Sequence, residues 1–158
     1  MIDGGEVVHE IELDAPREAV FEMLVRPEGL VRWLGIAAEL EPRPGGRFRF
    51  EVAPGQFCEG AYLAIEPPAR VEVSWGWSDP AMGLPPGSSR VEIVLGDLGG
   101  RTALRLVHRD LPGDLRLLHD DGWTRFLSRL SAVAAGREPG EYPSGDPHAR
   151  RAELEAPG

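Results

Sequence analysis

The longest helical pattern in the chain lies near its C-terminal end, over residues 119–136. Apolar side chains recur there at intervals of three and four residues, which places them on one face of an α-helix. Most of the polar residues fall on the other side. The pattern predicts an amphipathic helix whose apolar face must be buried against a second layer of structure. That face consists of Trp123, Phe126, Leu127, Leu130, Val133 and Ala134.

Segments in which apolar and polar residues alternate dominate the chain before this helix. Successive side chains of a strand point to opposite faces of a sheet, so this alternation is typical of half-buried strands. Most of the segments are separated by short turns rich in glycine and proline, which favours antiparallel pairing. Seven strands are predicted, over residues 6–13, 36–40, 47–52, 56–65, 70–77, 90–95 and 102–108.

Two short helices are predicted after the first strand, around residues 19–24 and over residues 28–34. Residues 78–88 form a loop that is longer than a hairpin needs, and we expect it to cover another part of the molecule. Residues 137–158 are rich in proline, glycine and charge, and they predict a flexible or surface-draped tail. The predicted fold is therefore α+β, a curved antiparallel sheet of about seven strands wrapped around one long C-terminal helix.

Composition narrows the classes of partner. The 158 residues fit one domain with a real core, and the net charge of −9 argues against nucleic-acid binding and against an anionic membrane surface. No segment approaches the length of a membrane span, and the first residues lack the pattern of a signal peptide, so we expect a cytoplasmic protein. Cys58 is the only cysteine, which excludes an intrachain disulfide.

Aromatic residues gather on the predicted inward faces and give the sequence its candidate chemistry. A sheet closed around a helix encloses space, and rings lining that space would contact an apolar ligand while indole N–H groups serve as polar handles. A packed core is the alternative for each of these residues. The candidate ligand-binding residues are Trp33, Phe48, Phe50, Trp75, Trp77, His108, Trp123, Phe126 and Leu127.

Histidines and acids supply the candidates for catalysis. His9, His108 and His119 can all point inward, and His108 is the candidate to hydrogen-bond a ligand or act as acid or base. Glu59 is the acidic candidate, in a strand whose phase is ambiguous because Gly60 could mark a bulge. No zinc-binding, serine-nucleophile or nucleotide-binding motif is present, so the sequence predicts no metal site and no cofactor.

Gly122 is unusual inside the long helix, where glycine costs about 1 kcal/mol relative to alanine. We expect it early in the helix, at a place where a side chain would crowd the strand beneath.

Several local motifs resemble the START-like (SRPBCC, helix-grip) superfamily and, within it, the AHSA family named for the activator of the HSP-90 ATPase. Each motif is short, and their common order makes the resemblance specific. It covers about residues 6–135, so residues 1–136 are interpreted as one START-like domain. The motifs are residues 15–21 (APREAVF), residues 27–30 with Trp33, residues 60–68 running into 71–75, His108, Gly122-Trp123, Phe126-Leu127 and Leu130.

The resemblance implies three functional hypotheses. The first is binding of a hydrophobic small molecule between the sheet and the C-terminal helix, without catalysis and with no catalytic residue assigned. The second is a chaperone-associated, stress-response protein-interaction module. The third is an enzyme similar to polyketide cyclases or hydrolases, with His108 or Glu59 in the cavity as the base. The implied partners are a hydrophobic small molecule or a chaperone, and the implied oligomeric state is a monomer or a homodimer.

Overall fold

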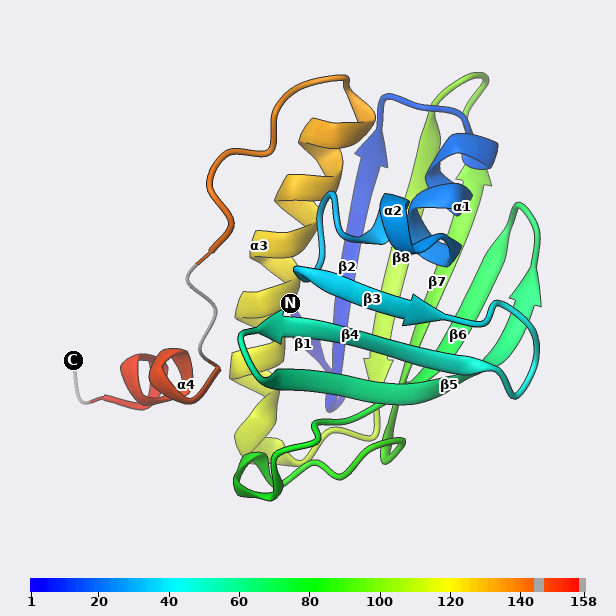
Figure 1. Ribbon diagram of the computed structural model, residues 1–158. Helices are drawn as coiled ribbons and strands as arrows, with labels where there is room; N and C mark the ends of the chain where they lie inside the picture. Colours follow the sequence, from blue (N-terminus) through cyan, green and yellow to red (C-terminus); the bar gives the residue numbers. More distant parts are fainter. Residues whose placement is uncertain (144–146, 157–158) are drawn as a thin grey trace.

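The computed structural model describes residues 1–143 and 147–156, and it has the α+β helix-grip architecture that the sequence predicts (Figure 1). One curved antiparallel sheet wraps around the long helix α3 (Arg116–Ala134), and α1 (Arg17–Val25) and α2 (Pro27–Leu30) follow β2. In the described residues the sheet has eight strands. They are β1 (Ile2–Asp3), β2 (Glu6–Leu13), β3 (Ala37–Leu40), β4 (Arg47–Ala53), β5 (Gln56–Glu66), β6 (Arg70–Trp75), β7 (Ser89–Asp97) and β8 (Thr102–Arg109).

The strand order explains how the sheet comes to enclose the helix. Its order is β1-β2-β8-β7-β6-β5-β4-β3, so β2 and β3, which are consecutive in the chain apart from α1 and α2, lie near opposite edges. The two short helices α1 and α2 connect β2 to β3, and so link the two edges of the curved sheet. β2 pairs instead with β8, where Val7 stands opposite His108. Figure 1 shows α3 running along one side of the curved sheet.

Two of the predicted strands differ from the observed ones near a glycine. The sequence extends the fifth predicted strand to Trp77, but the observed strand β6 ends at Trp75, and Trp77 forms an isolated bridge with Cys58. A Cβ on Gly76 would lie 1.9 Å from the carbonyl oxygen of Pro85, so the following loop passes directly over this position. In β5 the irregularity lies between Tyr62 and Ala64, not at Gly60.

Helix α3 begins three residues before the predicted start, and the expectation for Gly122 is wrong. An added Cβ at Gly122 would meet no atom within 4 Å, so the glycine does not relieve a clash with a strand. The prediction failed because it placed Gly122 in the first turn of the helix. With the start at Arg116, Gly122 lies in the second turn beside open space.

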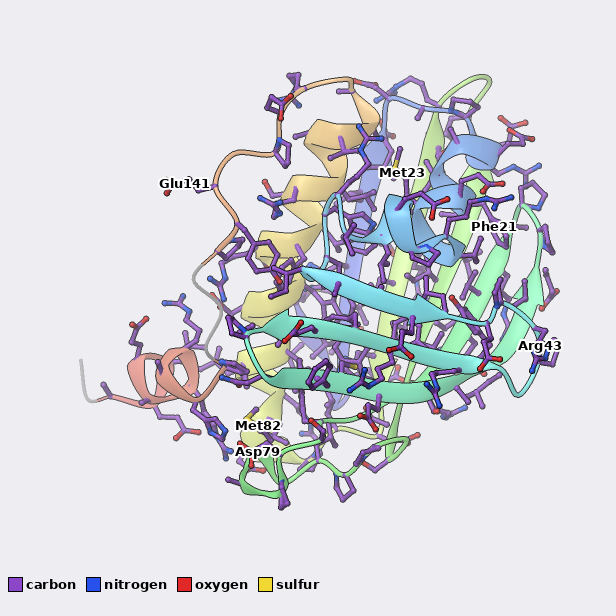
Figure 2. All side chains as sticks on the ribbon, viewed as in Figure 1. Phe21, Met23, Arg43, Asp79, Met82 and Glu141 are labelled. Carbon is purple, nitrogen blue, oxygen red and sulfur yellow. The ribbon has the colours of Figure 1, made fainter. Side chains whose placement is uncertain are left out.

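The loop between β6 and β7 contributes to the core. It contains the short 3₁₀ helix η1 (Pro80–Met82), and the side chains of Met82 and Leu84 are almost completely buried. Figure 2 shows Asp79 and Met82 at the end of the molecule where α3 begins. A second 3₁₀ turn, η2 (Gly113–Leu115), leads directly into α3.

Residues 137–158 contain a helix that the sequence pattern did not predict. Helix α4 (Pro147–Glu155) lies beside the first half of α3 (Figure 1). The chain leading to it is held by Arg129, whose guanidinium donates to the carbonyl oxygens of residues 139–141, and by Tyr142, whose hydroxyl donates to Val52 O at 2.8 Å. These contacts are tertiary, which is why the composition of the segment did not reveal the helix.

Candidate functional site

A cavity of about 60 Å³ lies between α3 and the inner face of the sheet, with α4 on its outer side. Strand alternation places Phe50 and Trp75 on this inner face, and the helical repeat of α3 places Trp123 and Phe126 opposite them. The wall is almost entirely apolar. The residues that line the cavity are Leu34, Phe50, Val52, Trp75, Trp77, Leu118, His119, Gly122, Trp123, Arg125, Phe126, Pro147 and Arg150.

Trp75 is the centre of the aromatic wall. The centroid of its ring lies 5.1 Å from that of Trp123, 5.3 Å from that of Phe50 and 5.7 Å from that of Trp77. The rings meet at tilted or edge-on angles, the arrangements that aromatic quadrupoles favour. The indole N–H of Trp75 is buried and has no hydrogen-bond partner in the described part of the chain.

Five of the nine predicted ligand-binding residues line this cavity: Phe50, Trp75, Trp77, Trp123 and Phe126. Trp33 and Phe48 border a second, smaller space of about 20 Å³ between the sheet and α2, on the other side of the Trp75 ring. Trp33 is fixed there because its indole N–H donates to Met23 O at 2.9 Å.

His108 and Leu127 do not line the cavity. Leu127 faces the opposite side of α3, where it borders an open groove. His108 is fully buried behind Trp123, whose indole N–H donates to His108 Nδ1 at 3.1 Å. The hydroxyl of Ser89 donates to Trp75 O, so the remaining 2.9 Å contact is a hydrogen bond from His108 Nε2–H to Ser89 Oγ. Both ring nitrogens are therefore satisfied inside the protein.

His119, one turn before Trp123, is the histidine that lines the cavity. Its Nδ1–H donates to Leu115 O at 2.8 Å, and its Nε2 accepts from the indole N–H of Trp77 at 3.1 Å. Burial lowers the pKa of His119 to about 4, and burial together with the neighbouring His119 holds the pKa of His108 well below its ordinary value. Both rings are neutral near pH 7, and neither has a free lone pair to act as a base.

Glu59, the predicted acidic candidate, points away from the cavity. Its carboxylate accepts from Arg49 Nε at 3.1 Å, on the solvent side of the sheet. Among the described residues, the cavity wall includes no carboxylate. The pair of acid and base that the enzyme hypothesis needs is therefore not assembled in the described part of this cavity.

The outer end of the cavity carries charge. Arg125 from α3 and Arg150 from α4 both line it. Both form ion pairs with Asp121, and Asp121 itself does not line the cavity. Arg150 donates to the two oxygens of Asp121 at 2.7 and 2.9 Å, and this contact lowers the pKa of Asp121. The contact also fastens α4 over the cavity.

Eight wall residues are absent from the predicted set. Val52 has a visible signal, because it shares its strand face with Phe48 and Phe50. His119 is among the inward-facing histidines that the sequence indicates, but the prediction favours His108 as the ligand-binding one. Pro147 and Arg150 have no signal, because their segment shows no pattern that would bring it to the wall. The others are Leu34, Leu118, Gly122 and Arg125.

The structure also gives evidence on metal binding and on membrane-spanning helices. No group of three or more histidine, cysteine, aspartate and glutamate side chains in residues 1–143 and 147–156 is arranged to hold a metal ion. None of the helices in that part of the chain is both long enough and apolar enough to cross a membrane.

The chain belongs to the AHSA1 family, described as activator of Hsp90 ATPase homolog 1-like proteins, whose family model matches residues 14–135. This confirms the resemblance on which the sequence motifs converge. A search among curated proteins finds no match.

Solved structures show the same fold. An AHSA1-like protein from Rhizobium etli is 43% identical, with 87% of this chain and 86% of that chain covered and a TM-score of 0.68. A protein from Mesorhizobium loti is 25% identical, with coverage of 83% and 97% and a TM-score of 0.74. The Aha1 dimer from Colwellia psychrerythraea is 18% identical, with coverage of 82% and 95% and a TM-score of 0.70. At that last identity the similarity concerns the fold alone.

Proposed function

We propose that the protein binds an apolar, ring-containing small molecule in the aromatic cavity between the sheet and α3, and that it does so without catalysis. The observation that carries the proposal is the convergence of Phe50, Trp75, Trp77 and Trp123 from separate elements on one partly enclosed apolar space. Enclosed apolar walls with few polar groups are the usual form of a small-molecule site. The neutral, fully hydrogen-bonded state of His119 supports a binding role over proton transfer.

Entry of a ligand requires that α4 move outward. The closed cavity measures about 60 Å³, whereas pockets for drug-sized ligands measure roughly 300–1,000 Å³. Surface contacts hold α4: the ion pairs of Arg150 with Asp121 and of Arg151 with Asp114 at 2.7 Å, and the hydrogen-bond contact of His148 Nε2 with Asp79 Oδ2 at 2.7 Å. Such pairs contribute little stability, about 0–1 kcal/mol each, so displacing α4 costs much less than opening the core.

Chaperone binding, the alternative drawn from the resemblance, has the family description as its support. The cavity favours a small molecule as the ligand, because the surface of a partner protein would not reach the cavity side chains that lie behind α4. A homodimer is the assembly that the Colwellia psychrerythraea relative illustrates.

Gly122 offers a direct test of the proposal. It lines the cavity and has open space where a side chain would project, so Gly122→Leu is expected to fill the entrance without disturbing the helix. The measurement is calorimetric titration with a panel of neutral one- to three-ring aromatic compounds, with naphthaleneacetamide as the reference. We expect binding to the original protein and a loss of affinity of about tenfold or more in Gly122→Leu.

The matched control is Ser128→Leu, which adds the same side chain to an exposed position on the opposite face of α3. It is expected to leave the affinity unchanged. The proposal is wrong if no compound of the panel binds, or if the two leucine variants bind the panel equally well.

A further inference from the structure

The charged groups of the cavity wall are of one sign. Arg125 and Arg150 are the charged side chains that line it in the described part of the chain, and His119 is neutral. The whole chain has a net charge of −9, so the two positive charges beside this small apolar cavity are opposite in sign to the charge of the protein as a whole. A guanidinium presents a planar fork of donors that fits a carboxylate.

Asp121 pairs with both arginines, but unequally. Its two oxygens accept from Nη2 and Nε of Arg150, at 2.7 and 2.9 Å. Arg125 Nε lies 3.3 Å from Asp121 Oδ2 as an ion pair, but this nitrogen is buried and has no hydrogen-bond partner among the described residues. A buried donor with a charged neighbour but no well-aligned hydrogen bond can gain one from a group bound in the cavity.

The other charged groups near α4 are already occupied. Glu153 accepts from Arg150 Nη1 at 2.9 Å and is mostly exposed, and Arg151 is paired with Asp114 and Glu155. None of these acids lines the cavity. The buried donors of the described cavity wall that lack a hydrogen bond are therefore Arg125 Nε and the indole N–H of Trp75, and only the first carries a charge.

We propose that the ligand is an apolar carboxylic acid, whose ring system lies against the aromatic wall and whose carboxylate binds Arg125 and Arg150 at the mouth of the cavity. The inference rests on the proposed function and adds to it the charge and orientation of the ligand. α4 then has two roles, since it closes the cavity and supplies one of the two guanidinium groups.

The test compares two probes of the same skeleton, naphthaleneacetic acid and the neutral naphthaleneacetamide, by calorimetric titration of the full chain at pH 7 and low salt. We expect the acid to bind about tenfold more tightly than the amide, because a charge-assisted pair is gained at a partly dehydrated site. Raising the ionic strength is expected to reduce this preference without changing the affinity for the amide.

Three variants locate the carboxylate. Arg125→Gln and Arg150→Gln are each expected to lower the affinity for the acid by a larger factor than the affinity for the amide, so that the preference for the acid falls. Asp121→Asn removes the competing carboxylate and is expected to raise the affinity for the acid. The control is Arg101→Gln, because Arg101 forms comparable ion pairs with Asp14 and Glu12 away from the cavity. Thermal unfolding of each variant checks that it is folded.

The outcomes separate this inference from the proposed function. Equal affinity for acid and amide overturns the inference and leaves the proposed function intact. A preference for the acid that survives both arginine variants places the carboxylate elsewhere and also overturns it. If neither probe nor any compound of the neutral panel binds, the proposed function itself is wrong.

Discussion

Helix α3 borders two hollows, the aromatic cavity on one face and an open groove on the other. The groove measures about 550 Å³, roughly nine times the cavity, and about half of its lining is polar, including Thr124, Ser128 and Ser131. Polar side chains open to solvent keep their hydrogen bonds with water, so a ligand there gains little by replacing it. The comparison teaches that enclosure and desolvation, more than volume, mark the candidate binding site.

The histidines that line the groove and the cavity also differ in burial. His9, at the groove, is partly exposed, and its Nε2 lies 2.9 Å from Asp120 Oδ1. Burial lowers the pKa of His9, while Asp120 acts in the opposite direction. His119, at the cavity, has no carboxylate partner among the described residues, and its pKa falls to about 4. Both pKa values are therefore lowered, and a carboxylate opposes the change at His9.

The largest expected effect comes from removing the centre of the aromatic wall. Trp75→Ala takes away the ring that contacts Phe50, Trp77 and Trp123, and large-to-small changes of this kind cost about 3–5 kcal/mol. The free energy of unfolding in urea measures the loss. Ser128→Ala at the groove is the control and is expected to change stability by less than about 0.5 kcal/mol. Similar losses in the two variants would contradict the comparison.

The second-largest expected effect is a loss of stability at low pH, caused by the buried histidines near the cavity. The pKa of His119 is lowered from 6.5 to about 4, so the unfolded state binds more protons between these values. Stability is then fully present above pH 6.5 and falls as the pH drops towards 4, by about 3 kcal/mol from His119 alone. The lowered pKa of His108 adds to the fall.

Urea unfolding at a series of pH values between 7 and 4 measures this dependence. His119→Gln removes the titrating group and keeps an oxygen that can accept from Trp77, so the fall should become shallower. An unchanged pH profile in His119→Gln would show that the buried ring does not titrate as described.

The smallest expected effect concerns the helix between the two hollows. Gly122→Ala should raise the free energy of unfolding by about 0.5–1 kcal/mol, because a Cβ there meets no atom and alanine favours a helix. Gly136 provides the contrast: its φ of 75° lies in the left-handed region, so Gly136→Ala should destabilise the protein. Thermal unfolding of the two variants checks the opposite signs, and a destabilised Gly122→Ala would show that the space is filled.

The aromatic part of the cavity wall could be predicted from the chain, and the reason is geometric. Alternation along β4 and β6 fixes which side chains face inward, and it correctly selected Phe50 and Trp75. The helical repeat selected Trp123 and Phe126 in the same way. The geometry of the local backbone decides which residues of a strand or helix share a face, so the order of apolar and polar residues predicts that face.

The errors arose where tertiary contacts decide the outcome. Periodicity shows that His108 and Leu127 are buried, but it does not show on which side of α3 they lie. The choice of His108 over His119 was wrong for the cavity wall, because Trp123 lies between His108 and the open space. Arg150 reaches the wall through an ion pair between distant residues, for which the local sequence carries no signal.

The pairing of β2 with β8 has a consequence for the order of folding. Strands β4 to β8 follow one another as neighbouring hairpins, whereas β2 must find a partner about 100 residues further along the chain. Contacts between distant residues carry the entropy of closing a long loop. During synthesis β2 is therefore among the first elements made and among the last to gain its partner, and α3, which supplies a wall of the cavity, is made after β8.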